Sequence, residues 1–577
     1  MSAFAVWSAA HPMTYEGFFP NFSTSALWGL LFALLFILLK EAFEKNSRRL
    51  TVTALSVSLV LSLCRLFGAG LQIQGSILWV FRNGETLFWG FSYFFGFAII
   101  CFAFVSFLFR KADEFVFSAP ERFSWKRAAL MTLCLMLAWL PWFLSQYPGI
   151  LSVDSRNQMR TALGLDPMAD YHPVFHTLLI RWALVIGRAL FGTNQEGTAV
   201  YSVLQMLFMA LSFSVSLELV RKYQVSRFFR VTAFLWFALY PVHGTFAITM
   251  WKDILYSGAV LAYTALLFYA LMEKQKSGNC VFYQKRYCFL LVFFSLLMPF
   301  LRHNGFYALV LSVPFLALAL PEQRKAYIIL SAVSVIFYLG VRNVLFPALG
   351  VLPGRAVEML SVPLQQIGMT FKRHKDVFTD KEWDMIHRYF TGDELGAIYN
   401  PMWADRMKIP FNSQAYDEDK TGFFEMWAHF GAKYWKDYID ALLYNCYGYW
   451  YPEAENYVFI FGVDNELGDV YEDPIWNPQW MRDYREWLDH SEFYRQPLLS
   501  LLFSPGAYFW LLLIAFAYCV YRRSPLAMLF MPCFFTWLTA LGSPVFCEYR
   551  YLYPLVVSSP LLTGGILPGC RDDCSTK

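Results

Sequence analysis

The sequence predicts an all-α polytopic membrane protein with about 13 transmembrane helices and a mostly helical domain outside the membrane. Of its 577 residues, 57% are hydrophobic and 19% aromatic, while only 16% are charged. Soluble chains are far less apolar than this. Many apolar stretches approach the roughly 20 residues that a helix needs to cross a bilayer core. Lysine and arginine gather in loops that alternate with these stretches, as cytoplasmic loops require.

Thirteen apolar segments are predicted to cross the membrane, since a helix satisfies all its backbone hydrogen bonds internally. They lie near residues 25–43, 51–71, 86–109, 127–146, 199–220, 231–250, 254–272, 287–301, 305–320, 326–345, 499–520, 525–541 and 551–568. We expect three leading helices in residues 25–126 and a membrane core in residues 127–345. Residues 498–577 hold the last three helices and a tail.

The orientation of these segments follows from their basic loops. Seven stretches, together with Lys40, hold 23 of the 47 Lys and Arg residues. The stretches are residues 45–49, 110–127, 221–230, 274–286, 324–325, 522–523 and the C-terminal tail. All seven are therefore predicted to be cytoplasmic, with the C-terminus inside and residues 1–24 outside. No Lys or Arg precedes Lys40, so a cleaved signal peptide is not expected and the first apolar segment is predicted to be a permanent helix.

One apolar segment, Pro173 to Phe191, is predicted not to cross. Counting it as a span would invert every later basic loop, and it carries Arg181 and Arg188 on an otherwise apolar surface. An amphipathic helix lying at the outer membrane surface accounts for both observations. The first outer loop, residues 147–198, is therefore expected to have structure of its own.

Residues 346–497 form a second, polar unit with 25 acidic and 14 basic residues, a net charge of −11. The basic pairs that flank it, each one helix away, place it outside. Because it is rich in Trp and Tyr, unlike disordered segments, we expect a compact domain with helices near 380–390 and 421–444. Its aromatic run 444–452 either holds a glycan or anchors the domain at the membrane interface, and anchoring is favoured.

Charged and polar residues gather at the outer ends of the predicted helices. They are Asp154, His172, Lys252, Asp253, Arg302, His303, Asn304, Glu548 and Arg550. Each has a structural interpretation when taken alone: Asp154 can cap a helix, and Lys252-Asp253 can be a neutralised turn. Charges beside a membrane are costly, however, and usually mark function. Their common side therefore indicates one site at the outer membrane surface.

These residue types suit a reaction at a lipid phosphate. Lys252, Arg302 and Arg550 can neutralise a phosphate or pyrophosphate carried by a lipid. We expect partial burial to raise the pKa of Asp154 toward that of a general base, which takes the proton of an attacking hydroxyl. The pattern predicts displacement of a lipid-phosphate leaving group, with the cations stabilising its developing charge.

Four short motifs carry a resemblance to a known group. They are Tyr147-Pro148-Gly149 leading to Ser152 and Asp154-Ser155, then Tyr171-His172-Pro173-Val174, Trp251-Lys252-Asp253, and Arg302-His303-Asn304-Gly305. With the late segment from Glu548 to Pro554, they resemble GT-C membrane glycosyltransferases such as the protein O-mannosyltransferases and the aminoarabinose transferases. The chain is most similar to an uncharacterised bacterial family of multi-spanning proteins grouped with these enzymes. The resemblance covers about residues 125–345 and the last 35.

The resemblance implies a GT-C-like fold and inverting transfer of a sugar from a polyprenyl-phosphate donor to an acceptor hydroxyl on the outer face of the cell membrane. Asp154 would act as the base or orient the acceptor, and Asp253 would be a second acidic residue. The remaining residues of the set would bind or surround the donor phosphate, His172 with a possible catalytic role: His172, Lys252, Arg302, His303, Asn304, Glu548 and Arg550. The acceptor is a glycan, a protein or a cell-wall polymer. No cofactor is assigned, and a divalent metal stays open because members of the group differ in metal use.

Two other function classes stay open. A transporter or flippase of lipid-linked glycans would need a polar path through the bilayer, whereas the predicted spans are nearly uncharged apart from Arg65 and Glu218. Another outer-surface transferase, such as an acyltransferase or a glycan ligase, would be indicated if His172 were the essential base and Asp154 dispensable. Nucleic-acid binding is not expected, since the basic residues are spread thinly over the loops.

Overall fold

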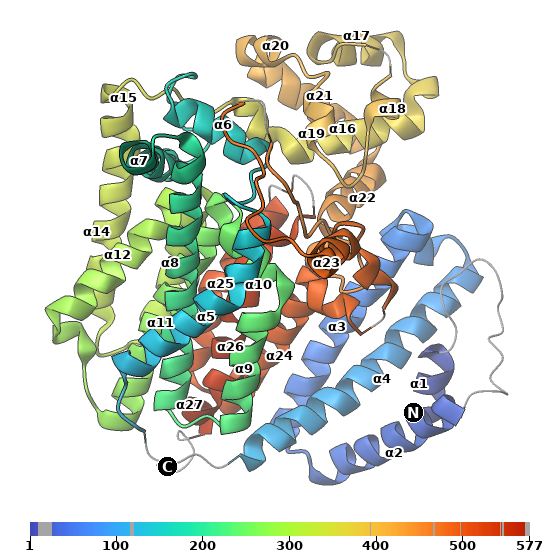
Figure 1. Cartoon of the computed structure of the whole chain (residues 1–577). Coiled ribbons are helices and arrows are strands. Elements are labelled where there is room, and N and C mark those ends of the chain that lie inside the picture. Colours follow the sequence, from blue (N-terminus) through green and yellow to red (C-terminus); the bar gives the residue numbers. More distant parts are fainter. Residues whose placement is uncertain are drawn as a thin grey trace.

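Long helices running between the two ends of the molecule make up most of the structure (Figure 1). The computed structural model describes residues 1–9, 26–115, 120–392, 394–464, 468–496, 498–542, 544 and 547–571. Over these residues the chain is helical, with five isolated β-bridges and no strand. The prediction of an all-α polytopic membrane protein is confirmed at this level.

Nine helical segments in the described part of the chain are long and apolar enough to cross a membrane. They are α3 (Arg48–Gln74), α4 (Gly84–Glu114), α5 (Trp125–Ser145), α7 (Val174–Phe191), α8 (Asn194–Lys222), α11 (Lys252–Ser277), α14 with its continuation (Arg324–Ala348), α24 (Pro505–Arg522) and the segment Pro525–Gly542 that ends in α25 (Met531–Gly542). A tenth is formed if α9 (Arg227–Leu239) and α10 (Pro241–Ile248), bent by 49° at Tyr240-Pro241, count as one span.

The count of thirteen predicted spans is higher because four of them form other kinds of helix. Helix α2 (Ala26–Lys45) lies across the lower end of the molecule in Figure 1. Helices α12 (Lys285–Leu301) and α13 (Asn304–Ala319) have 17 and 16 residues, and such helices are about 25 Å long, short of the roughly 30 Å core. The last predicted span is divided into α26 (Tyr553–Pro560), a π-helical turn and α27 (Leu567–Arg571).

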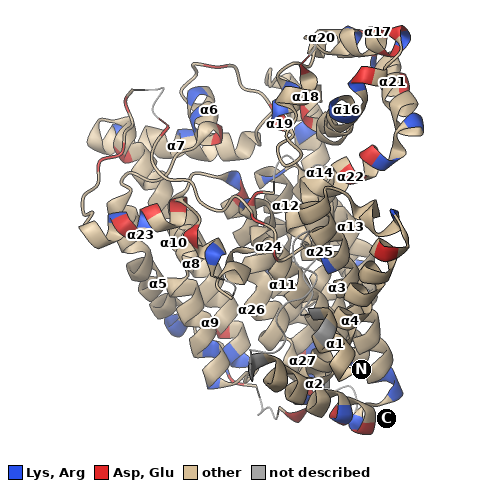
Figure 2. Ribbon diagram, turned by 90° about the vertical axis from the view of Figure 1, so that its right-hand side faces the viewer, with Lys and Arg blue, Asp and Glu red and all other residues tan. Residues whose placement is uncertain are grey.

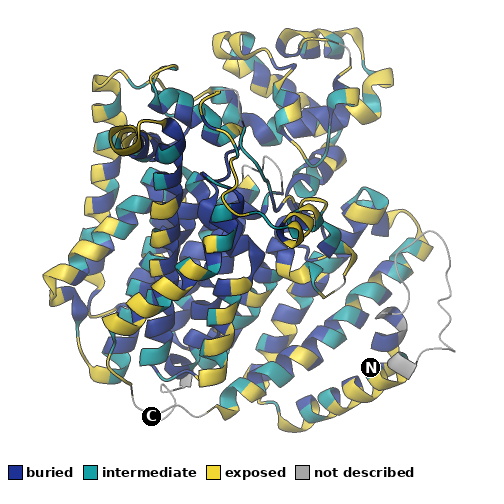
Figure 3. Cartoon of the chain, viewed as in Figure 1, coloured by how far each residue is buried: buried dark blue, intermediate teal, exposed yellow. Residues whose placement is uncertain are grey.

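The arrangement of charge and burial is that of a membrane protein. Lys, Arg, Asp and Glu gather toward the two ends of the molecule, and few lie on the helices between them (Figure 2). The peripheral helices carry exposed residues along their outward faces (Figure 3), and many of these are apolar, among them Leu137, Phe91 and Phe337. Helix α11 lies at the centre, with 83% of its most apolar 18 residues buried. Its first residue is Lys252, so the core positions this lysine at the end of the bundle that the sequence predicts to face outward.

Helix α7 crosses the end of the bundle instead of running along it. Figure 1 shows α7 along its axis while α8 runs from top to bottom. The two helices touch closely, since a Cβ atom on Gly187 would lie 2.1 Å from the backbone nitrogen of Gly197. Arg181 and Arg188 lie on the exposed side. This is the arrangement expected of an interfacial helix, although the length and composition of α7 would also allow a span.

The polar unit 346–497 divides into two parts. Residues 356–446 form a helical domain with its own hydrophobic core, which includes Leu364, Phe371, Tyr389 and Phe430. Its helices are α16 (Ser361–His374), α17 (Asp380–Tyr389), α18 (Leu395–Ile398), α19 (Asp405–Lys408), α20 (Ser413–Glu418), α21 (Lys420–Lys433) and α22 (Trp435–Cys446). The helix predicted over 421–444 is thus broken at Tyr434.

The second part, from residue 447 onward, packs into the core of the membrane domain and contains α23 (Gln479–Asp489). Tyr449 is 0%, Tyr451 2% and Trp450 7% exposed. The prediction that the run 444–452 anchors the domain at the interface is therefore wrong for these three residues, and so is the alternative that they stack on a glycan. Their rings are core side chains, and an aromatic run alone does not tell whether its rings face the membrane interface or the core.

The leading helices hold the outer domain in place. Arg65 of α3 forms an ion pair of 3.2 Å with Glu453, and Asp440 of α22 accepts a hydrogen bond of 3.1 Å from the backbone of Ile77. Helix α1 (Ser2–Ala9) packs against Gly96, in the middle of α4. In Figure 1 this segment lies beside the helices, and most of the rest of residues 1–24, predicted to be outside the membrane, falls outside the described residues.

Candidate functional site

Short backbone pairings bring four distant segments together at one end of the bundle, which we call the outer end after its predicted orientation. Ile150 donates to the carbonyl of Ile248 at 3.0 Å and accepts from Met250 at 3.0 Å. Tyr549 donates to the carbonyl of Tyr457 at 2.9 Å, and Tyr457 donates to that of Cys547 at 3.2 Å. These pairings place the start of α6 (Val153–Ala162), the start of α11 and residues 547–550 side by side.

Asp154, in the first turn of α6, is the centre of the resulting charge network. Its Oδ2 accepts a hydrogen bond of 3.0 Å from Arg550 and lies 3.5 Å from Nζ of Lys252. Lys252 Nζ in turn lies 3.3 Å from Nδ1 of His172. Arg550 also bonds Glu548. Asp154, His172, Lys252, Glu548 and Arg550 were all predicted from the sequence, and the structure brings all five into one network.

The pKa of Asp154 differs from the expectation. Burial alone would raise this pKa, but the positive charges of Lys252 and Arg550 outweigh burial and hold it well below its usual range. The expected raised pKa is therefore a misprediction for the free protein, because a sequence does not tell how many cations face one carboxylate. Asp154 is an ionised, ion-paired group whose side chain is 27% exposed.

His172 is a neutral imidazole in this network. Burial and the nearby charge of Lys252 lower its pKa to about 3. Because the ammonium of Lys252 can only donate, Nδ1 of His172 accepts, and the proton of the ring is on Nε2. Within the described part of the chain this Nε2 is buried without a hydrogen-bond partner. His172 thus presents a donor to a group that the chain does not itself supply.

Asp253 and Arg302 form a second pair beside the network. Asp253 Oδ1 lies 2.7 Å from an Arg302 amino nitrogen, in an alignment that is not a hydrogen bond. The side chain of Asp253 is only 1% exposed. Its contact with Arg302 makes Asp253 the counter-ion that holds this arginine, a different use from the second catalytic acid that was predicted.

Two aromatic rings, which the sequence reasoning missed, order the cations. The guanidinium of Arg550 lies 4.4 Å from the ring centre of Trp251, and that of Arg302 lies 4.4 Å from Tyr551. Tyr551 also faces Arg550 at 5.2 Å. Such contacts hold a guanidinium in place while leaving its N–H groups free to donate. A signal was present, since each ring directly adjoins a charged residue in the motifs Trp251-Lys252 and Arg550-Tyr551.

His303 and Asn304 lie apart from the Asp154 network. His303 Nε2 is 3.6 Å from Asp170, which also pairs with Arg342 at 3.2 Å. Asn304 is the half-buried first residue of α13. The described contacts of these two residues do not reach Asp154, so the structure does not group them with the predicted phosphate ligands.

A buried polar chain supports α6 from behind. His176 contacts Gln158 and Tyr201, each at 2.6 Å. Tyr201 donates to Gln205 at 2.9 Å, and Gln205 donates to the carbonyl of Thr249 at 2.6 Å. The chain links α6 to the turn before Lys252. The sequence held a signal for this chain too. Gln158 comes four residues after Asp154, and His176 comes four residues after His172.

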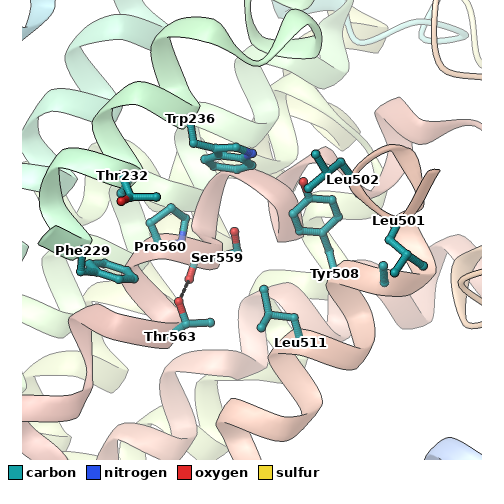
Figure 4. A pocket seen from close by; sticks show the side chains of 12 residues that line it. Phe229, Thr232, Trp236, Leu501, Leu502, Tyr508, Leu511, Ser559, Pro560 and Thr563 are labelled. Carbon is teal, nitrogen blue, oxygen red and sulfur yellow. Dashed lines mark hydrogen bonds between the residues drawn. The ribbon is translucent and has the colours of Figure 1, made fainter. Parts of the chain in front are cut away.

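An apolar groove of about 390 Å³ opens between α9, α24 and α26 (Figure 4). Trp236 and Phe229 lie on one side, Tyr508 and Leu511 on the other, and Pro560 between them. The groove wall at Leu502 is tied to the site, because its carbonyl accepts hydrogen bonds from Tyr240 at 2.6 Å and from Tyr549 at 3.3 Å. Tyr549 directly precedes Arg550.

No three His, Cys, Asp or Glu side chains in the described residues are grouped to hold a metal ion.

Comparison with known proteins gives one match. No curated protein and no solved structure matches the chain. A family model described as a family of unknown function, DUF6020, matches residues 166–564. The matched region includes Lys252, Arg302 and Arg550 but begins after Asp154. Because it covers more than half of the 577 residues, the chain belongs to the DUF6020 family.

Proposed function

We propose that this chain is an integral membrane glycosyltransferase that moves a sugar from a polyprenyl-phosphate-linked donor to an acceptor hydroxyl on the outer face of the membrane. The observation that carries the proposal is the sharing of one carboxylate, Asp154, by Lys252 and Arg550 at the end of the bundle. Such a site holds a base and two phosphate ligands within contact of each other. A GT-C-like fold is part of the same proposal.

The donor phosphate would bind where cations have N–H groups to spare. Arg550 and Arg302 present fixed guanidinium forks beside Tyr551, and His172 adds a buried N–H donor. Arginine forks suit phosphate geometry better than any other side chain. The apolar groove at Leu502 supports a lipid donor, because it offers a hydrocarbon chain a surface connected to Arg550 through Tyr549 (Figure 4).

Binding of the phosphate would also prepare the base. A phosphate that bonds Lys252 and Arg550 competes with Asp154 for them, and loss of these charges raises the pKa of the carboxylate. The acceptor oxygen then attacks the anomeric carbon while the bond from that carbon to the phosphate oxygen breaks. The phosphate keeps the electron pair, which the cations stabilise, and Asp154 takes the hydroxyl proton.

Two observations favour this proposal over the alternatives. With its proton on Nε2 and its Nδ1 turned to Lys252, His172 has no nitrogen available as a base, which weighs against an acyltransferase or ligase built on it. The charges that a transport path would use are ion-paired near opposite ends of the bundle. Arg65 pairs with Glu453 at 3.2 Å and Glu218 with Arg221 at 2.8 Å.

The test is binding and turnover in lipid nanodiscs. We expect native mass spectrometry to detect a polyprenyl phosphate but not the matching polyprenol. Arg550→Gln should weaken this binding about 30-fold, since a charge-assisted phosphate contact contributes about 2 kcal/mol. Arg82→Gln, which changes an exposed arginine far from the site, is the control. Equal binding of the phosphate and the alcohol would refute the donor assignment.

A further inference from the structure

A second groove lies on the outer side of the start of α6. Its volume is about 530 Å³, and it is lined by residues 151–153 on one wall and by residues 460–464, 471 and 472 on the other. Val153, which lines it, directly precedes Asp154. The groove is therefore adjacent to the candidate base and separate from the apolar groove between the helices.

The walls of this groove are fixed by the fold. Leu151 donates to the carbonyl of Gly462 at 3.1 Å, and Asp464 donates to the carbonyl of Leu151 at 3.0 Å. The side chain of Gln195 holds Tyr471 through both its backbone N–H and its carbonyl, at 3.1 and 2.9 Å. A groove whose walls are bonded in this way is pre-formed and needs little reorganisation to bind a ligand.

Among the described residues, each carboxylate that lines the groove is paired with an arginine. Asp464 accepts from Arg156 at 3.0 Å and Glu472 accepts from Arg485 at 3.0 Å. Each of these bonds uses one oxygen of its carboxylate, so each carboxylate keeps acceptor capacity for a further donor. This differs from the network at Asp154, where two cations face one carboxylate. A neutral ligand rich in hydroxyl groups fits the groove, and a phosphorylated ligand does not.

The groove also offers an apolar surface next to these acceptors. Tyr471 is 50% exposed. The floor beside it is bare backbone, because Gly462 has φ of +85°, a conformation that favours glycine. Phe461 contributes little, since the guanidinium of Arg485 lies over its ring at 5.5 Å. One free aromatic face beside two carboxylates matches a sugar ring, which has an apolar C–H face and hydroxyl donors at its edge.

We propose that this groove is the acceptor subsite and that the acceptor is a neutral glycan chain. The inference rests on the proposed function and names its second substrate. A sugar bound against Tyr471 and Asp464 would lie across the first turn of α6, where Val153 is followed by Asp154. A glycan hydroxyl at this end of the groove is then presented to the carboxylate that takes its proton.

The test is saturation-transfer NMR on the whole purified protein with three neutral probes, maltotriose, chitotriose and mannotriose. We expect at least one of them to bind. Tyr471→Ala and Asp464→Asn should each weaken that binding about fivefold, as loss of an aromatic face or a hydrogen bond does. Trp480→Ala, which removes an aromatic ring of α23 that is 57% exposed and outside the groove, is the control. Val153→Phe fills the groove from the α6 side and should block binding with the fold intact, as checked by thermal denaturation.

The outcomes separate this inference from the function on which it rests. If no probe binds, or if Tyr471→Ala and Val153→Phe leave binding unchanged, the acceptor assignment is overturned. Asp154→Asn should leave glycan binding intact, because Asp154 does not line the groove. If polyprenyl phosphate fails to bind while a glycan binds with this pattern, the donor assignment fails and the groove is a glycan site of another activity.

Discussion

Each end of the helix bundle holds a cluster of buried charges, and the two clusters differ in how completely they are hydrogen-bonded. At the inner end, Glu218 is fully buried and accepts two bonds of 2.8 Å from Arg221 and one of 2.7 Å from the backbone of Ser124. At the outer end, His172 Nε2, one amino group of Arg302 and both oxygens of Asp253 are buried without hydrogen bonds in the described part of the chain.

This difference identifies which cluster is structural. Buried polar groups in folded proteins are nearly always hydrogen-bonded, and each exception needs an explanation. In the inner cluster, Glu218 joins the backbone of Ser124 to the side chain of Arg221, and both carboxylate oxygens are hydrogen-bonded within the chain. The outer cluster leaves the buried Nε2 of His172 without an acceptor among the described residues, which is the arrangement of a site whose partner is a ligand. Substitutions at the two clusters test this difference. A substitution in the outer cluster should lower activity or donor affinity, and one in the inner cluster should lower stability.

The largest effect is expected from Asp154→Asn, which keeps the shape of the side chain but removes the base. Turnover of a glycosyl polyprenyl phosphate should fall about 10²–10⁴-fold, the usual contribution of a general base. Thermal stability should change little, because the side chain of Lys252 is 17% exposed and the buried Arg550 keeps Glu548. Asp166→Asn, in the same outer loop and paired with Arg160, is the control and should retain full turnover. If Asp154→Asn kept a tenth of the activity, Asp154 would not be the base.

At the inner end, Glu218→Gln should act on stability instead. The substitution weakens the buried acceptor of Arg221 and of the Ser124 N–H, while Arg221 keeps its ion pair with Glu121, so we expect a cost of about 1–3 kcal/mol of unfolding free energy. We expect a lower melting temperature but unchanged affinity for polyprenyl phosphate. Glu44→Gln, which changes a 56% exposed partner of Lys40, should have almost no effect on melting. Loss of donor affinity without loss of stability would contradict the structural assignment of the inner cluster.

Arg302→Gln should show both kinds of effect, because Arg302 faces the site and also neutralises Asp253. Affinity for polyprenyl phosphate should fall about 10-fold or more, as expected for a charge-assisted contact, and melting temperature should fall because Asp253 is left charged and buried. The double variant Arg302→Gln with Asp253→Asn separates the two. Stability should recover while donor affinity stays low. If affinity recovered as well, Arg302 would be only the counter-ion of Asp253.

The sequence predicted the architecture better than the chemistry of single residues. Apolar segments and basic loops indicate helices and their polarity directly, so most of the membrane helices were found. Their lengths depend on where prolines and polar turns interrupt them, as at Pro560 in the last predicted span, and nine or ten of the described helical segments are long and apolar enough to cross.

The same limit applied to the site. Five of the nine side chains predicted to share one site lie in one network, but burial and pairing are tertiary properties. The ion pair of Asp253 with Arg302 and the burial of Trp450 depend on segments far apart in the chain. The acidic unit shows this limit as well. Its composition is uniform, yet residues 356–446 have their own core while the residues after 446 belong to the membrane domain.

The smallest effect, and the sharpest test of the outer network, is the pH dependence of turnover. Asp154 must be ionised to take a proton, so activity is lost only when pH falls through its pKa. In the free protein Lys252 and Arg550 hold this pKa well below its usual range. The ratio kcat/KM reports the free enzyme and should therefore stay level from pH 8 down to about 5.

In the donor complex the phosphate competes for both cations, and the pKa of Asp154 rises. The acid limb of kcat, which reports the complex, should thus lie at higher pH than that of kcat/KM. Because the pKa of His172 is about 3, neither profile should show a step near the ordinary histidine value. Arg550→Gln removes one cation from the free protein and should move the limb of kcat/KM upward, toward that of kcat. A step near pH 6.5 that disappears in His172→Asn would transfer the role of base to His172, and the outer cluster would then belong to a different class of transferase.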